Sequence, residues 1–190
     1  EQEIRYTDDV LQRLVDGLRR VVPDERLLLV VTADHGEEFG EHGLLTHNQL
    51  FDEVMHVPLV FVWPGHVAAG RRASELVSLV DVAPTLLQLA GVAAPPGIEG
   101  LSLAPLLTGA GGTLPRDTVF GEYPRTLDVH ERHFVARSRD AKCIVTPSGA
   151  SDACWDLSAD PAEKSPRTPG ETEAFAKLHD AARAYAARSM

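Results

Sequence analysis

Apolar residues recur at helical spacing, or in short unbroken runs, through the first part of the chain. Residues 7–22 place apolar side chains on one helical face, which predicts a helix capped by Thr7 or Asp8. The runs 27–31 and 58–63 are continuously apolar, which is typical of strands buried on both faces of a parallel sheet. Further helices are predicted over residues 81–90, where Asp81 is the cap, and 102–107.

The pattern changes after Ala110-Gly111-Gly112, which we interpret as the boundary between two domains, 1–112 and 113–190. Strand-like pieces separated by turns predict a small antiparallel sheet, and residues 171–188 predict a terminal amphipathic helix. The predicted fold class is therefore α/β. It comprises a partial doubly wound sheet, mixed or parallel, flanked by helices, and a small C-terminal antiparallel sheet with a terminal helix. The strand-like pieces are residues 117–123, 133–138, 141–146 and 153–157.

Length and charge narrow the classes of function. The 190 residues carry a net charge of −10, which argues against nucleic acid or an anionic membrane as the main partner. An anionic substrate stays compatible with this charge, because a bound cation can dominate one cleft. No apolar run approaches the roughly 18 residues that a membrane span needs. The chain begins with Glu-Gln-Glu, so we expect it to be part of a longer polypeptide.

The two cysteines, Cys143 and Cys154, flank a turn-rich stretch and can face each other across a hairpin. A disulfide there would indicate an oxidising compartment. Neither cysteine has a metal-binding spacing, and we favour free thiols over a disulfide.

The segment with the clearest chemistry is the end of the first predicted strand. Asp34 and His35 follow this strand directly, at the edge where ligands bind in open α/β sheets, and Gly36 permits a sharp turn. A carboxylate and an imidazole can hold a divalent cation, although at least two more ligands must come from elsewhere. Residues 36–50 are predicted to form a loop, in which Glu37, Glu38 and Glu41 are interpreted as a solvated acidic surface, with extra metal ligands as the alternative.

Several motifs in order along the chain resemble the sulfatase branch of the alkaline phosphatase superfamily. Each motif alone is weak, and their order over residues 4 to 165 makes the resemblance specific. They are Thr-Ala-Asp-His-Gly-Glu at 32–37, Gly-Glu-His-Gly at 40–43, Val-Pro-Leu at 57–59, the helix at 81–91, Gly-Leu-Ser-Leu-Ala-Pro-Leu-Leu at 100–107 and Trp-Asp-Leu-Ser-Ala-Asp-Pro-Ala-Glu at 155–163.

The resemblance implies a metal-dependent sulfuric ester hydrolase, with Asp34 and His35 as ligands of a divalent metal. Calcium is the metal expected, with zinc or manganese as alternatives. His47 stands where many sulfatases carry a lysine that contacts the sulfate group. A protonated imidazole there can hold the anionic ester or protonate the leaving oxygen, so His47 is the candidate catalytic and substrate-binding residue.

The nucleophile motif of that family, Cys- or Ser-x-Pro-x-Arg, is absent from these residues. The resemblance places it, with the formylglycine made from its cysteine and two further metal carboxylates, in an upstream half of the same polypeptide. We therefore expect this chain to be a C-terminal fragment without turnover alone, from an enzyme acting on a small-molecule or carbohydrate sulfate ester.

Two other functions remain open. A phosphoethanolamine transferase or a phosphonate or phosphodiester hydrolase of the same superfamily also uses an Asp-His-Gly-Glu motif. The upstream nucleophile separates these classes, since a threonine there indicates a transferase. A non-catalytic metal-binding domain is the third possibility, and metal titration together with an Asp34→Ala variant tests it.

Overall fold

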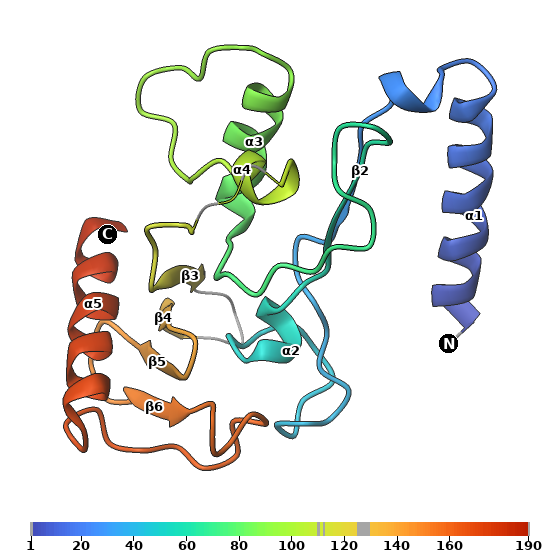
Figure 1. The fold of residues 1–190 in the computed structure, drawn as a ribbon. Coiled ribbons are helices and arrows are strands. Elements are labelled where there is room, and N and C mark those ends of the chain that lie inside the picture. The colour runs from blue at the N-terminus through green and yellow to red at the C-terminus, as the bar shows by residue number, and fades with distance from the viewer. Residues whose placement is uncertain (1, 110, 112, 125–129, 190) are drawn as a thin grey trace.

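The computed structural model describes residues 2–109, 111, 113–124 and 130–189. It is a mixed α/β arrangement with a two-stranded sheet and a four-stranded antiparallel sheet, which confirms the predicted fold class (Figure 1). The domain boundary predicted at 110–112 includes two residues outside the described part of the chain. The helices and strands of the first part are α1 (Gln2–Arg19), β1 (Leu29–Thr32), α2 (Asp52–Met55), β2 (Leu59–Val62), α3 (Val82–Leu89) and α4 (Ala104–Leu107).

Strands β1 and β2 pair with each other in antiparallel orientation, with Thr32 opposite Leu59 and Leu29 opposite Val62. The predicted burial on both faces is wrong for these strands, because Val31 is 44% exposed and Val60 is 48% exposed. The apolar runs were correctly assigned as strands. Burial on both faces requires elements that cover both sides of the sheet, and the described residues do not supply them.

Helix α1 begins at Gln2, earlier than predicted, so Thr7 and Asp8 lie within the helix and do not cap it. None of its residues is buried, and Figure 1 shows it on the opposite side of the molecule from α5. The apolar face predicted from its spacing is therefore present but uncovered. None of the helices in the described residues has the length and apolar character that crossing a bilayer requires.

The second part contains the main hydrophobic core. Its four strands follow the order β3-β4-β5-β6, and every neighbouring pair is antiparallel, as predicted. The helix α5 covers one face, whereas Leu50, Phe51 and Met55 from the first part pack on the other. Because side chains alternate across a strand, both faces of this sheet are apolar. The elements are β3 (Val119–Tyr123), β4 (His133–Arg137), β5 (Ala141–Val145), β6 (Ala153–Asp156) and α5 (Glu173–Ser189).

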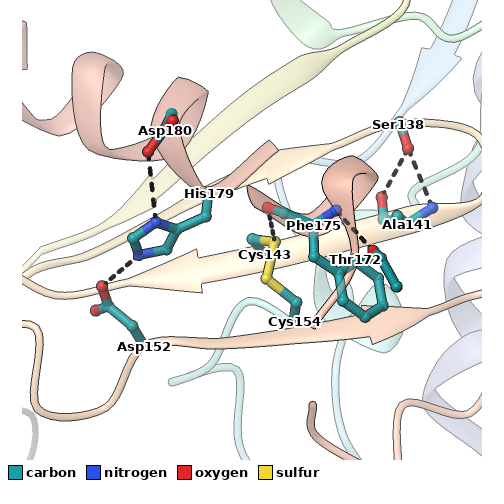
Figure 2. The surroundings of a disulfide bond; sticks show 9 residues. All are labelled: Ser138, Ala141, Cys143, Asp152, Cys154, Thr172, Phe175, His179 and Asp180. Carbon is teal, nitrogen blue, oxygen red and sulfur yellow. Dashed lines mark hydrogen bonds and ion pairs between the residues drawn. A yellow bond between two sulfur atoms is a disulfide. The ribbon is translucent and has the colours of Figure 1, made fainter. Parts of the chain in front are cut away.

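Cys143 and Cys154 form a disulfide between β5 and β6, so the expectation of free thiols is wrong (Figure 2). The two residues are directly opposite in the strand register. Antiparallel pairing therefore brings the two sulfur atoms together on the face that α5 covers. The spacing alone left this open, because a hairpin register off by one residue would place the side chains on opposite faces.

Candidate metal and substrate site

The turn that follows β1 rests on α2. Strand β1 ends at Thr32, and the amide of Gly36 donates a hydrogen bond to the carbonyl oxygen of Val54 over 2.7 Å. The contact is so close that a Cβ at position 36 would lie 1.9 Å from the carbonyl oxygen of Glu53. Glycine is therefore required here by close backbone approach, and this approach defines where the preceding Asp34 and His35 lie.

Asp34 and His35 present their polar atoms near each other. The carboxylate oxygen Oδ2 of Asp34 lies 3.8 Å from Nε2 of His35, and the Asp34 side chain is 91% exposed. Nδ1 of His35 lies 2.9 Å from the carbonyl oxygen of Gly36, which only accepts, so we assign the proton to Nδ1. Nε2 then keeps its lone pair, which is the arrangement of a metal-ligating histidine.

The side chain of His47 lies beside that of His35. Its ring stacks on that of His35 with centroids 4.3 Å apart, and its Nδ1 lies 3.1 Å from Oε2 of Glu37. One ligand atom from each of His35, Glu37 and His47 lies within 4.8 Å of the other two. Imidazole and carboxylate together suit divalent metals such as zinc or manganese. The resemblance to sulfatases implied that His47 belongs to the site. No motif in the sequence predicted the contact of Glu37 with His47.

The loop over residues 36–50 contains no helix or strand, as predicted, but its acidic residues differ in environment. Glu38 is buried, contrary to the prediction of a solvated surface. Its amide donates a hydrogen bond to the carbonyl oxygen of Thr46, which closes the loop between these two residues. Burial raises the pKa of Glu38; the charge of His42 opposes this effect, and neighbouring carboxylates add to it. His42 itself stacks on Phe51 and lies 3.3 Å from Oε2 of Glu53.

Asp34, His35 and His47 line one groove of about 600 Å³. Its other wall belongs to the second part of the chain and includes β3 and Arg137. Arg137 is held by Asp52, with Nη2 2.9 Å from Oδ2. Sequence reasoning missed Asp52 and Arg137, because no local pattern relates two residues so far apart in the chain. The groove is thus lined by the carboxylate of Asp34, two imidazoles and a guanidinium.

The strand-end Asp-His pair and the mixed α/β fold are the features that the resemblance to the sulfatases implied. Residues 40–183 match the family described as N-sulphoglucosamine sulphohydrolase, C-terminal, and the chain belongs to this family. This confirms the resemblance that the ordered motifs indicated.

Among curated proteins, the chain is similar to N-acetylglucosamine-6-O-sulfatase of Bacteroides thetaiotaomicron, with 33% identity over 163 residues. The match covers 82% of this chain and 29% of that protein. The chain thus spans about 30% of the length of the curated relatives it matches first.

Solved structures also share the fold. BT4656, in complex with its substrate D-glucosamine-2-N,6-O-disulfate, matches with a TM-score of 0.82 and 28% identity, covering 98% of this chain and 38% of that one. The phosphonate monoester hydrolase of Agrobacterium radiobacter matches with a TM-score of 0.79 and 28% identity, covering 96% and 39%.

Proposed function

We propose that the protein is a metal-dependent sulfatase that hydrolyses a sulfate ester of a carbohydrate, and that this chain supplies part of its active site. The observation that carries the proposal is the meeting of Asp34, His35 and His47 in one groove. An upstream half of the same polypeptide, with the nucleophile, belongs to the proposal. So does the division of this chain into a catalytic part, 1–112, and a C-terminal subdomain, 113–190.

Asp34 and His35 would hold the divalent cation, for which we propose calcium. The exposed carboxylate and the free Nε2 fit such an ion, and the remaining ligands would come from upstream carboxylates. When bound, the cation would offset the negative charge of the ester and of the ionised nucleophile. In the sulfatases, this nucleophile is the hydrate of a formylglycine. Zinc or manganese are the alternatives, favoured by the nearby imidazole of His47 and carboxylate of Glu37.

His47 is the proposed contact to the sulfate group and the proposed proton donor to the leaving oxygen. The Glu37 carboxylate lies 3.1 Å from Nδ1, and this contact holds the ring in one orientation. Nε2 is then the atom left to face the ester. The amino-sugar sulfatases among the relatives support a sulfated carbohydrate as the substrate class, because their names place sulfate on glucosamine derivatives.

A phosphonate or phosphodiester hydrolase is the second candidate. The structure of the Agrobacterium radiobacter phosphonate monoester hydrolase resembles this chain about as closely as BT4656 does. Both reactions place a tetrahedral anionic ester beside a cation, so the residues of this chain serve either one equally well. The comparison of substrates in the following experiment separates them.

The test uses the protein with its upstream segment and compares an aryl sulfate, an aryl phosphate and a 6-O-sulfated glucosamine. We expect the sulfates to be hydrolysed faster. The variant Asp34→Ala should lower kcat/KM by about 100-fold or more and abolish calcium binding measured by calorimetry. His47→Gln should lower kcat by about 100-fold with calcium binding retained.

His66→Gln is the matched control, because His66 stacks on Trp63 at the far end of β2, away from the groove. It should leave kcat, KM and calcium affinity unchanged. Full activity in Asp34→Ala would disprove the metal assignment. A preference for the phosphate ester would support the second candidate, and metal binding without any ester hydrolysis would indicate a binding domain only.

A further inference from the structure

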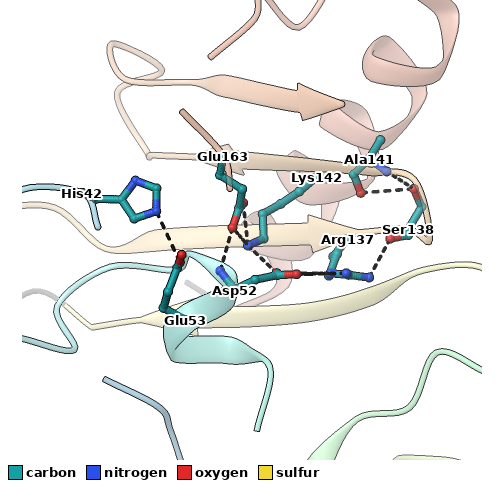
Figure 3. Close-up of polar contacts among 8 residues, drawn as sticks. All are labelled: His42, Asp52, Glu53, Arg137, Ser138, Ala141, Lys142 and Glu163. Carbon is teal, nitrogen blue, oxygen red and sulfur yellow. Dashed lines mark hydrogen bonds and ion pairs between the residues drawn. The ribbon is translucent and has the colours of Figure 1, made fainter. Parts of the chain in front are cut away.

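The C-terminal sheet reaches the candidate site through a buried ion cluster (Figure 3). Lys142 on β5 has a completely buried side chain, and its Nζ lies 2.8 Å from Oδ1 of Asp52 and 2.7 Å from Oε1 of Glu163. Lys142 points to the same face of β5 as Ile144, the face on which Leu50 and Phe51 pack. The register of β5 therefore directs this ammonium group toward α2.

Glu163 completes the cluster from the Asp160–Glu163 turn, the end of the sequence motif at 155–163, to which the sequence alone assigned no role. Its Oε2 accepts a hydrogen bond of 2.6 Å from the amide of Asp52. Its backbone has a φ of 52°, a left-handed conformation that residues other than glycine rarely adopt. Arg137 holds the other carboxylate oxygen of Asp52 at 2.9 Å. The first residue of α2 is thus bound by three residues of the C-terminal part.

Helix α2 in turn contacts the turn that carries the proposed metal ligands. Val54 accepts the hydrogen bond from the amide of Gly36, directly after His35. Glu53 lies 3.3 Å from His42, in the loop that leads to His47. Because α2 has only four residues, a shift of Asp52 moves both contacts.

We propose that Lys142 and Glu163 are positioning residues for the site: they fix α2, and α2 fixes the turn that presents Asp34 and His35. This inference rests on the proposed function for its role in metal binding. Replacing a buried ion pair by apolar residues of similar size is often neutral or stabilising, so stability alone does not account for the cluster. The cluster is instead explained by its geometry, because it connects α2 to residues of the C-terminal part that are distant in sequence.

The experiment measures two properties of Lys142→Met and Glu163→Gln in the protein with its upstream segment. The first is amide hydrogen exchange of residues 33–38 without metal, which reports how firmly the turn is held, because the amides of Gly36 and Glu38 donate to Val54 and Thr46. We expect it to become about tenfold faster in Lys142→Met and a few-fold faster in Glu163→Gln. The second is the calcium affinity, which we expect to fall about tenfold in Lys142→Met and a few-fold in Glu163→Gln. Excess calcium should restore kcat in both variants.

Asp152→Ala is the control for general loss of stability. Asp152 lies 2.7 Å from Nε2 of His179 on α5 (Figure 2). Helix α5 packs on one face of the sheet, and Met55 of α2 packs on the other. Compared with Lys142→Met or Glu163→Gln at the same decrease in melting temperature, Asp152→Ala should leave amide hydrogen exchange of residues 33–38 and the calcium affinity unchanged. If Lys142→Met does not fold, the result for Glu163→Gln alone tests the positioning role. This variant should fold, because its side-chain amide oxygen can still accept the hydrogen bond from the amide of Asp52.

Unchanged exchange at residues 33–38 in the folded variants would overturn the positioning role, whether or not calcium binds. Equal effects in the variants and in Asp152→Ala would overturn it too, because they would indicate stability alone. If exchange responds as expected but the wild-type protein binds no calcium and cleaves no sulfate ester, the proposed function fails and the positioning role stands.

Discussion

The amide of Gly36 donates a hydrogen bond of 2.7 Å to the carbonyl oxygen of Val54, which places the turn after β1 against α2. This single contact joins the proposed metal ligands to the helix that the C-terminal sheet holds. It also explains why the turn needs a glycine, since the backbone of Glu53 occupies the space where a Cβ would lie.

Gly36→Ala is therefore expected to lower the free energy of unfolding by about 2 kcal/mol, because the new methyl group would lie 1.9 Å from a backbone oxygen and force α2 and the turn apart. Denaturant unfolding measures the change. Gly17→Ala is the matched control: no atom lies within 4 Å of the position that its new methyl group would take, and alanine in helix α1 should be neutral or stabilise by about 0.5–1 kcal/mol. Equal stabilities of the two variants would contradict the close approach.

Loss of the disulfide should weaken the C-terminal sheet. The bond closes a loop with a sequence separation of 11, so Cys143→Ala/Cys154→Ala should lower the free energy of unfolding by about 3 kcal/mol. Both cysteines are completely buried, so a reductant should act on the wild-type protein only as it unfolds. Thermal unfolding with and without reductant measures this: the midpoint of the wild type should fall, and that of the double variant should not change. A wild-type protein insensitive to reductant would indicate that the bond does not form.

Asp81 is the buried anchor between the start of α3 and the segment that follows it. Its carboxylate accepts hydrogen bonds from the amides of Ser78 and Leu101 and pairs with Arg116. Burial raises the pKa of Asp81, but these hydrogen bonds and the Arg116 charge outweigh it and lower the pKa below its usual value. Asp81→Ala should therefore cost about 3 kcal/mol, because it leaves buried donors and a cation unpaired.

Asp117→Ala is the comparison for Asp81, since Asp117 is exposed beside Arg116. Urea unfolding should show a change within about 0.5 kcal/mol for this variant. A comparable loss in both variants would show that Asp81 is not the anchor.

Stability should depend on pH through Asp52. Burial raises the pKa of Asp52, but the hydrogen bonds and charges of Arg137 and Lys142 outweigh it and lower the pKa to about 2. A carboxyl group whose pKa is lowered on folding stabilises the fold at pH values above its ordinary pKa of 3.8. This contribution is lost as the pH falls from about 4 through about 2. It amounts to about 2 kcal/mol, following from the difference between the two pKa values.

Asp52→Asn removes this titration. The difference in unfolding free energy between wild type and Asp52→Asn, measured from pH 6 to pH 2, should be largest at pH 6 and shrink as the pH falls. A difference that stays constant over this range would show that Asp52 does not titrate with a lowered pKa.

The local features of this chain can be predicted from its residues alone. The apolar run before Asp34 and His35 predicted a strand ending at a ligand-binding edge, and the turn signals predicted the β3–β6 sheet, because both depend on neighbours in the chain. The order of the motifs indicated the family. These are properties of short segments; the structure confirms the strands and the comparisons confirm the family.

Contacts between residues far apart in the chain could not be predicted in this way. The disulfide between Cys143 and Cys154 depends on strand register, and the pairing of Asp52 with Lys142 depends both on register and on the packing of α2 against the C-terminal sheet. A change of register by one residue would turn each of these strand side chains to the opposite face. Composition and spacing contain no such information, because register results from the packing of the complete core.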